Sequence, residues 1–335
     1  MILVSGATGH LGNVLVRKLV SKGENVRALI LPGETTHHLP ETGVEIVEGD
    51  VLNQDSLKKA MNDVKTVYHL AGVISTVSGT EAIMERVNVE GTRNVVASAL
   101  ESGVERLIHT SSVHALKRAP EGEIMDENTP LDPNNPAGAY DQSKAKGTME
   151  VYNGIEKGLN AVIVCPTGII GPYASANSEM GKVIKSFARK KLHFIVDGSF
   201  DFVDVRDVAD GLILAAEKGK TGEKYILGGE NIEIKDILQM IQKETNVKAP
   251  YITLPSNIAL FSARIGELIC RFIKSAPSFT PYSLHTLFDN SNYSSNKAKK
   301  ELGYRPRALR ESISDTIKWH LNSLKVYNKS PIPLN

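Results

Sequence analysis

The chain has 335 residues, of which 41% are hydrophobic and 23% are charged, proportions typical of a globular protein with a sizeable core. Its 39 lysines and arginines are balanced by 38 aspartates and glutamates, so it has neither a basic footprint for nucleic acid nor a polybasic segment for an anionic membrane. This length fits one large α/β unit or a nucleotide-binding domain with a smaller partner.

The cysteines and the apolar segments indicate the setting of the chain. Cys165 and Cys270 lie far apart and show no spacing of a redox or metal motif, which favours a reducing compartment. The N-terminus begins with a strand pattern and carries no signal-peptide features. The most apolar late segment, Ile258–Ile273, is short and interrupted by charges, which predicts an amphipathic helix covering part of a pocket instead of a membrane span. We therefore expect a cytoplasmic protein.

The first half of the chain alternates short strand patterns with helical patterns. The predicted strands are Ile2–Ser5, Asn25–Leu31, Glu45–Glu48, Thr66–His69, Arg106–Thr110 and Ala161–Cys165. The predicted helices are Leu11–Ser21, Asp55–Met61, Glu81–Ser102 and Tyr140–Lys157. Regular alternation of this kind predicts an α/β fold with a doubly wound parallel sheet of the Rossmann type.

The pattern changes after Pro166, where glycine, proline and aromatic residues cluster. A helix at Val205–Ala216 and a strand at Tyr225–Leu227 predict a brief return to the main sheet, and the remainder reads as mostly helical. We therefore expect a nucleotide-binding domain over residues 1–170 plus about 204–228. A smaller, mostly helical substrate-binding portion is expected over residues 171–203 plus 229–335. It should cover the carboxyl edge of the sheet, where open α/β sheets bind ligands.

The strongest single signal is a glycine loop between the first strand and the first helix, in which two residues separate Gly6 from Gly9 and Gly9 from Gly12. Glycines allow a sharp turn and a close approach of the backbone to a pyrophosphate, while the helix N-terminus offers N–H groups and the positive end of its dipole. The alternative is a tight β–α turn without a ligand. The position between strand and helix favours the dinucleotide.

A proton-transfer pair is predicted at the start of a helix. Tyr140 and Lys144 are four residues apart, so both side chains occupy one helix face. An ammonium group close to a phenol lowers the pKa of the phenol, which would let Tyr140 exchange a proton with a substrate oxygen. Ser112 follows the strand that ends at Thr110, and its hydroxyl can hold that oxygen. The alternatives are a buried structural tyrosine and a simple Ser-Ser turn.

These features occur together with further motifs in a familiar order. The motifs are Gly49-Asp50-Val51, His69-Leu70-Ala71-Gly72, Asn88-Val89-Glu90-Gly91-Thr92, Thr110-Ser111-Ser112, Cys165-Pro166-Thr167-Gly168 and Phe202-Val203-Asp204-Val205-Arg206-Asp207-Val208-Ala209. With them, the chain resembles the extended short-chain dehydrogenase/reductases, also called the NAD-dependent epimerase/dehydratase family, nearly end to end. It is most similar to their dihydroflavonol-4-reductase-like and 3β-hydroxysteroid-dehydrogenase-like branch.

The resemblance implies a set of site residues. Its catalytic residues would be Ser112, Tyr140 and Lys144, with Ser111 in a supporting place. Its cofactor-binding residues would be Gly6, Thr8, Gly9, His10, Leu11, Gly12, Asp50, Val51, Leu70, Ala71, Gly72, Tyr140, Lys144, Pro166, Gly168 and Ile169. Within this set, Asp50 would receive the adenine amino group and Val51 would donate its backbone N–H. Residues 70–72 would line the ribose and the pyrophosphate.

The choice between NAD and NADP depends on the end of the second strand. An acid there binds the 2′-hydroxyl of NAD, and an arginine binds the 2′-phosphate of NADP. The strand ends in Leu29-Ile30-Leu31-Pro32, with neither. Because the strand end has no acid, no carboxylate there would repel the 2′-phosphate of NADP. His37 or His38 could face that phosphate. The sequence therefore favours NADP slightly over NAD.

Two local differences distinguish the reactions found in that family. Dehydratases carry Thr-Asp-Glu after the fifth strand, where this chain has Ser112-Val113-His114, and many sugar-nucleotide epimerases carry an arginine where Phe200 precedes Asp201. An aromatic side chain in place of a cation suits an apolar or ring-shaped substrate better than a diphosphate. We therefore expect an NAD(P)-dependent oxidoreductase that interconverts a ketone or aldehyde with its alcohol. Its pocket should be lined by Val73, Ile74, Val113, Tyr173, Met180 and Phe200.

Two other functions stay open. A nucleotide-sugar epimerase would use the same three catalytic residues and hold its cofactor tightly, whereas a non-catalytic NAD(P)-binding regulator usually lacks the tyrosine or the lysine. No His, Cys, Asp and Glu set has the spacing of a metal site, and we expect none. The family resemblance implies a homodimer with Glu81–Ser102 as an interface helix. Neither nucleic acid nor membrane is expected as a partner.

Four further polar residues are expected behind or beside the site. His69 and His109 lie in strand patterns and should be core or supporting residues. Asn88 should support the site through a hydrogen bond or a water relay. His114, just beyond Ser112, faces either the substrate or a loop.

Overall fold

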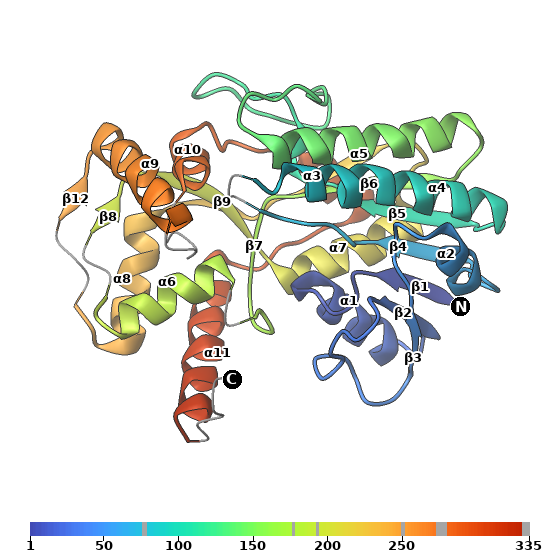
Figure 1. Cartoon of the computed structure of the whole chain (residues 1–335), viewed down its shortest axis with the longest axis horizontal. Helices are drawn as coiled ribbons and strands as arrows, with labels where there is room; N and C mark the ends of the chain where they lie inside the picture. Colours follow the sequence, from blue (N-terminus) through green and yellow to red (C-terminus); the bar gives the residue numbers. More distant parts are fainter. Residues whose placement is uncertain (76–78, 176–177, 192–193, 249–251, 273–279, 330–335) are drawn as a thin grey trace. The chain divides into compact units, whose positions relative to one another are not determined.

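The computed structural model describes residues 1–75, 79–175, 178–191, 194–248, 252–272 and 280–329. These residues form two compact units (Figure 1). Unit 1 comprises residues 1–167, 206–228 and 292–305. Unit 2 comprises residues 168–205, 229–291 and those from 306 onward.

Unit 1 is built around a sheet of seven parallel strands in the order β10-β6-β5-β4-β1-β2-β3. The strands are β1 (Ile2–Ser5), β2 (Val26–Ile30), β3 (Val44–Glu48), β4 (Thr66–His69), β5 (Arg106–Thr110), β6 (Ala161–Pro166) and β10 (Lys224–Leu227). The strand order reverses between β1 and β4, and open α/β sheets bind ligands outside the carboxyl ends of the strands at such a point. The predicted doubly wound parallel sheet is confirmed.

Helices cover both faces of this sheet (Figure 1). They are α1 (His10–Ser21), α2 (Gln54–Ala60), α3 (Glu81–Met84), α4 (Gly91–Glu101), α5 (Ala139–Glu156) and α7 (Val205–Lys218). The region expected as one helix over Glu81–Ser102 is divided, because a π-helical turn, η1 (Glu85–Glu90), separates α3 from α4. A short 3₁₀ turn, η2 (Val113–Ala115), follows β5, and a second π-helical turn, η3 (Ala298–Leu302), lies late in the chain.

One face of the sheet changes from apolar to polar toward the carboxyl ends of the strands. The core beneath α2, α4 and α5 includes, from neighbouring strands, Leu3, Val67 and Leu107. Two residues further along each strand, and so on the same face, come Ser5, His69 and His109, which are aligned across the sheet and at most 2% exposed. The apolar part of this face holds the helices on the sheet, and the polar layer places hydrogen-bonding groups behind its carboxyl edge.

Unit 2 is smaller and mostly helical. Its described strands form a three-stranded sheet of β7 (Gly168–Ile170), β9 (Ser199–Asp204) and β11 (Glu230–Glu233), and a pair of β8 (Ile195–Val196) and β12 (Thr253–Leu254). Its described helices are α6 (Glu179–Ala188), α8 (Ile234–Thr245), α9 (Ser256–Phe272), α10 (Pro281–Phe288) and α11 (Leu309–Lys329). Apolar residues of β7, α6, α8 and α11 form its core. The three-stranded sheet was not predicted, because strands as short as β7 and β11 show no clear alternation.

Two boundaries of the units differ from those expected. Residues 168–170 belong to unit 2, since β7 pairs with β9. Residues 292–305 belong to unit 1, where Met125 N–H donates to Asn292 O (2.9 Å) and the Tyr304 hydroxyl donates to Gly228 O (3.1 Å). Pairing between segments so distant in the chain has no signature in the local sequence pattern.

No helix within the described residues is both long enough and apolar enough to cross a membrane. The amphipathic helix expected at Ile258–Ile273 is α9, which ends at Phe272; residue 273 lies outside the described residues. Ala259 and Ala263 of α9 pack with Leu284 of α10. That α9 covers part of a pocket stays a prediction.

Candidate active site

The glycine loop leaves no room for side chains at two of its three glycines. Gly6 has φ +70°, and a Cβ atom there would lie 2.7 Å from the backbone nitrogen of Ala71. At Gly12 a Cβ would lie 2.0 Å from the carbonyl oxygen of Gly6, whereas at Gly9 the distance to that oxygen would be 3.3 Å. The loop can therefore close on itself and on residue 71 only with glycine at positions 6 and 12.

The N-terminus of α1 is suited to an anion. Gly9 is its N-cap, with extended backbone, no side chain caps the helix, and its first turn holds no acidic residue. The first N–H groups and the positive end of the dipole therefore meet no anionic side chain of the helix itself. A pyrophosphate fits this arrangement. Thr8, His10 and Leu11, which were expected to bind the cofactor, lie in this loop and in the first turn of α1.

A carboxylate that the strand pattern did not reveal lies beside the loop. The Thr8 hydroxyl donates to Glu34 Oε1 (2.5 Å), and Leu31 N–H donates to Glu34 Oε2 (3.0 Å). Glu34 comes four residues after β2 ends at Ile30, and the chain turns back at Gly33, which has φ +77°. An acid is thus present at the end of β2, although the strand itself ends without one.

Asp50 and Val51 follow β3 at the same edge of the sheet. Asp50 Oδ1 accepts from Leu52 N–H (2.9 Å), and Asp50 N–H donates to the Ser56 hydroxyl (3.1 Å). Val51 is buried, and its carbonyl accepts from Asn94 Nδ2 (3.1 Å). These contacts hold the turn after β3 in one conformation. Their roles toward an adenine stay predictions.

The segment after β4 is clamped by a side chain of η1. Asn88 Oδ1 accepts from Val73 N–H (2.7 Å), and Asn88 Nδ2 donates to Val73 O (2.9 Å). A Cβ at Gly72 would lie 3.1 Å from Asn88 Oδ1. Leu70 and Ala71 form the backbone against which Gly6 packs. Asn88 therefore shapes the segment that was expected to line the ribose and the pyrophosphate.

The Ser112 side chain lies close to the phenol of Tyr140 and lowers its pKa by hydrogen bonding. Ser112 follows β5, and its Oγ also accepts from His114 N–H (3.2 Å) at the start of η2. Tyr140 is the second residue of α5. The carboxyl end of β5 and the start of α5 thus bring these two side chains close enough for Ser112 to act on the phenol. Proton transfer to a substrate oxygen requires this convergence.

The pKa values of Tyr140 and Lys144 differ from the expectation. Burial raises the pKa of Tyr140 to about 12, while the Ser112 hydrogen bond lowers it and Asp141 raises it further. Burial lowers the pKa of Lys144 to about 8, and Lys144 Nζ donates to Thr110 O (2.7 Å). The prediction that Lys144 lowers the pKa of Tyr140 is therefore wrong for the protein alone, because withdrawal from water dominates. The phenol keeps its proton at neutral pH.

Ser111 stabilises the turn of α5 that carries the lysine. It is buried, and its Oγ lies 2.6 Å from Thr148 Oγ1. Thr148 Oγ1 donates its one hydrogen to Lys144 O (2.7 Å), so Ser111 is the donor to Thr148. The supporting role of Ser111 in catalysis stays a prediction.

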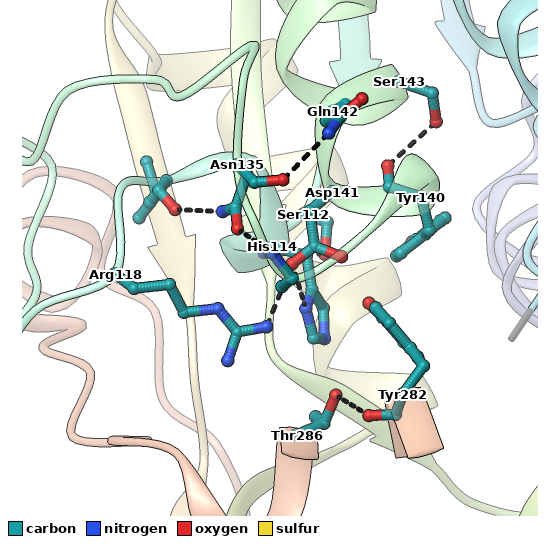
Figure 2. Close-up of polar contacts among 12 residues, drawn as sticks. Ser112, His114, Arg118, Asn135, Tyr140, Asp141, Gln142, Ser143, Tyr282 and Thr286 are labelled. Carbon is teal, nitrogen blue, oxygen red and sulfur yellow. Dashed lines mark hydrogen bonds and ion pairs between the residues drawn. The ribbon is translucent and has the colours of Figure 1, made fainter. Parts of the chain in front are cut away.

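A charged cluster that the sequence analysis missed lies beside Tyr140 (Figure 2). Asp141 is fully buried, and its Oδ1 lies 3.2 Å from His114 Nδ1 and 3.0 Å from an Arg118 guanidinium nitrogen. The His114 ring meets the Tyr140 ring edge to face, with centroids 5.7 Å apart. The cluster therefore touches the phenol through His114 and acts on its pKa through Asp141. The one signal in the sequence was that Asp141 follows Tyr140.

The loop that leads into α5 is held by Asn135 (Figure 2). This residue is fully buried, and its Nδ2 donates to Leu116 O (3.3 Å) while its Oδ1 accepts from Ala137 N–H (3.0 Å). Gln142 Nε2 donates to Asn135 O (3.0 Å). Asn135 thereby connects the start of α5 to the segment that follows Ser112, which fixes the position of Tyr140.

The expected site residues divide between the two units. Ser112, Tyr140, Lys144 and the cofactor-binding residues up to Pro166 lie in unit 1. Gly168 and Ile169 lie in β7 of unit 2. The carboxyl edge of one sheet therefore holds the glycine loop, the turn after β3, the segment after β4 and the Ser112–Tyr140 pair.

The residues expected to line a substrate pocket differ in exposure. Val113 and Phe200 are buried, whereas Ile74 is 75% exposed. Met180 packs against the core of unit 2. The pocket lining stays a prediction. Among the described residues, no group of three or more His, Cys, Asp and Glu side chains could hold a metal ion.

Comparisons with known proteins agree with this geometry. A profile of the NAD dependent epimerase/dehydratase family matches residues 2–228. The chain is 34% identical over 319 residues to sterol demethylase protein B of Methylococcus capsulatus, covering 95% of this chain and 97% of the relative. It is 33% identical over 323 residues to a putative dihydroflavonol 4-reductase of Synechocystis sp., covering 95% and 94%. The crystal structure of gox2253 matches it with a TM-score of 0.84 and 37% identity, covering 96% of this chain and 98% of that one.

Proposed function

The chain belongs to the NAD-dependent epimerase/dehydratase family, and we propose that it is an NAD(P)-dependent oxidoreductase that interconverts a ketone or aldehyde with its alcohol. The observation that carries the proposal is that Ser112, after the carboxyl end of β5, acts on the phenol of Tyr140, with Lys144 one turn further along α5. A relative that covers nearly the whole chain and is named as a putative dihydroflavonol 4-reductase supports it.

The residues of the site divide the work of such a reaction. A bound nicotinamide cofactor would supply or take up the hydride. Gly6 and Gly12 would let the loop approach its pyrophosphate, whose charge the N-terminus of α1 would stabilise. Ser112 would orient the substrate oxygen by a hydrogen bond, and Tyr140 would exchange a proton with it.

The state of Tyr140 favours one direction. A phenol with a pKa of about 12 carries its proton at neutral pH, so it is ready to protonate the alkoxide formed during reduction. Oxidation of an alcohol requires the phenolate, which burial disfavours. The protein without cofactor therefore holds Tyr140 in the protonation state that reduction uses.

The finer choice of cofactor turns on Glu34. From the strand end alone, the sequence favours NADP slightly. The Glu34 carboxylate beside Thr8 supports NAD instead, because a carboxylate accepts a hydrogen bond from a 2′-hydroxyl and repels a 2′-phosphate. We propose NAD as the preferred cofactor, with NADP as the alternative that nucleotide titrations decide.

An apolar, ring-containing substrate fits the chain better than a nucleotide sugar. Phe200 stands where many sugar-nucleotide epimerases carry a cation, so this position supplies no charge for a diphosphate. The relative named sterol demethylase protein B and the one named putative dihydroflavonol 4-reductase both point to ring systems. These names describe the relatives and support the substrate class proposed for this chain.

A substrate screen tests the proposal. The purified protein is mixed with NADH or NADPH and with steroid ketones, dihydroflavonols, simple aldehydes and UDP- or GDP-sugars, and the absorbance of the reduced nicotinamide is followed. We expect cofactor oxidation with apolar ketones. No net loss of reduced nicotinamide with any carbonyl compound, together with conversion of a UDP- or GDP-sugar to its epimer seen by chromatography and cofactor retained through gel filtration, would identify an epimerase. Nucleotide binding without any turnover would identify a regulator.

We also propose a homodimer formed through α4 and α5. Met149 of α5 is 43% exposed, and Arg93 of α4 pairs with Glu150 of α5 (2.7 Å), so apolar and charged groups share this surface. Light scattering that reports a monomer at micromolar concentration would contradict the dimer.

A further inference from the structure

Two histidines lie side by side in the polar layer behind the candidate site, but only one of them is hydrogen-bonded. His69 of β4 and His109 of β5 are register partners with ring centroids 5.4 Å apart, and they are 1% and 2% exposed. His69 Nδ1 lies 2.8 Å from Ser5 Oγ, and its Nε2 lies 3.0 Å from Thr92 Oγ1. Neither ring nitrogen of His109 has a hydrogen-bond partner among the described residues.

The contacts of His69 determine which of its nitrogens carries the proton. Thr92 Oγ1 donates its only hydrogen to Asn88 O (2.7 Å), so it accepts from His69 Nε2–H. Nδ1 is then the acceptor and receives the hydrogen of Ser5 Oγ. Ser5 Oγ in turn accepts from Ala71 N–H (3.3 Å). Every donor in this chain of bonds has an acceptor, and all the bonds run in one direction.

The chain of bonds continues to the start of α5. Asn88 Nδ2 donates to Ser143 Oγ (2.9 Å), and Ser143 Oγ donates to Tyr140 O (2.8 Å), a bond that Figure 2 shows. The same Asn88 side chain is hydrogen-bonded to both the backbone N–H and the carbonyl oxygen of Val73. His69 is therefore connected at one end to the backbone of residue 71 and at the other to the turn that carries Tyr140.

The protonation state of His69 agrees with this pattern. Burial and the charge of Lys144 lower its pKa to about 3, so the ring is neutral throughout the range in which the protein would work. A second proton on Nδ1 would face Ser5 Oγ and displace the hydrogen that Ser5 now donates. The neutral Nε2–H form alone satisfies the whole chain of bonds.

We infer that His69 is a positioning residue. Its Nε2–H tautomer fixes the position of the segment 71–73 relative to the first turn of α5. Its side chain reaches the first segment through Ser5 and the second through Thr92 and Asn88. The inference rests on the proposed function in one respect, namely that a nicotinamide nucleotide binds against residues 70–72. His109, equally buried in the next strand, contributes no such connection.

Paired substitutions test this role. Isothermal titration calorimetry of the full chain with NAD and NADH measures nucleotide affinity without any substrate. We expect His69→Leu to weaken binding about tenfold and to lower kcat about tenfold, since hydrogen bonds at both ends of the ring are lost. The matched variant His109→Leu should bind nucleotide within about twofold of wild type, because it removes no hydrogen bond. His69→Gln, which keeps an N–H donor and an acceptor, should recover part of the affinity.

A double variant separates positioning from packing. Thr92→Val keeps the shape of the side chain and breaks the link to Asn88, so it should reproduce most of the His69→Leu effect. The double variant His69→Leu/Thr92→Val should be no more than about twofold worse than either single variant, because both remove one connection. Ser5→Ala and Thr92→Val serve as the test if His69→Leu does not fold. Fully additive losses, or His69→Leu binding like His109→Leu, would overturn the inference and leave the proposed function standing. A wild-type chain that binds no nicotinamide nucleotide would overturn both.

Discussion

The glycine loop after β1 and the start of α5 lie at the carboxyl edge of one sheet, yet different parts of the chain shape them. In the loop the close contacts are between backbone atoms, since a Cβ at Gly12 would fall 2.0 Å from Gly6 O. At the start of α5 the contacts are between side chains: Ser112 acts on the phenol of Tyr140, and Asp141 pairs with His114 and Arg118. The loop is therefore sensitive to added volume, and the start of α5 is sensitive to lost hydrogen bonds and altered charge.

This difference implies that the two regions can be damaged independently. A substitution in the loop should weaken nucleotide binding and leave the proton-transfer pair in place. Removal of the Tyr140 hydroxyl alone should slow the chemical step and leave nucleotide affinity near wild type. Four predictions test how far this separation holds.

The largest effect is expected at Tyr140. Tyr140→Phe keeps the ring and removes the acid, so kcat should fall about a thousandfold while NAD affinity and thermal stability stay near wild type. Steady-state kinetics with the best ketone and calorimetry with NAD measure the two quantities. Tyr152→Phe, on the same helix, is the control and should retain activity. A Tyr140→Phe enzyme that turns over like wild type would remove this residue from the chemistry.

The next largest effect is expected in the loop. Gly12→Ala places a methyl group against Gly6 O, so NAD affinity should fall about a hundredfold and the free energy of unfolding by about 2 kcal/mol. Gly9→Ala is the matched control, because its methyl group would lie 3.3 Å from the same oxygen and requires only a small adjustment. Equal nucleotide affinity in the two variants would show that the loop tolerates volume and would end the comparison with α5.

The third prediction concerns Glu34. It tests whether a side chain contributes to nucleotide selectivity at a loop whose close contacts are between backbone atoms. Glu34→Gln should weaken NAD binding and strengthen NADP binding, changing the ratio of the two dissociation constants about tenfold, because one charge is removed beside Thr8. Glu48→Gln is the control, since that carboxylate at the neighbouring strand end accepts from Gly33 N–H (3.4 Å). An unchanged ratio in Glu34→Gln would show that Glu34 does not select between NAD and NADP.

The smallest effect concerns stability and pH. The folded-state pKa of Lys144 is about 8, below the usual lysine pKa of 10.5, so between these values the unfolded chain binds the extra proton. Stability should therefore rise as pH increases through this window, on the order of 1–3 kcal/mol, and Lys144→Met should lose this rise. Urea unfolding of both proteins from pH 7 to pH 10 measures it. Parallel pH profiles would mean that Lys144 is well hydrated.

Much of the fold was predictable because its pattern is local. The strands of the parallel sheet in unit 1 are apolar runs bounded by turns, and the predicted bounds agree with β1, β4 and β5 residue for residue. The helix expected over Glu81–Ser102 is interrupted by the π-helical turn at Glu85–Glu90, which residue periodicity did not reveal. The short strands of unit 2 pair with partners far along the chain, so their sequences show too little alternation to identify them.

The sequence by itself determined the parallel α/β architecture, the glycine loop and the residue types of the Ser112–Tyr140–Lys144 set, because each depends on neighbours within a few positions. Only the tertiary structure decided that Glu34 reaches Thr8, that Asp141 holds His114 and Arg118, and that His69 is bonded where His109 is not. It also decided that burial raises the pKa of Tyr140. The partners of a side chain and its access to water are set by which distant segments pack around it, and these are properties of the folded chain.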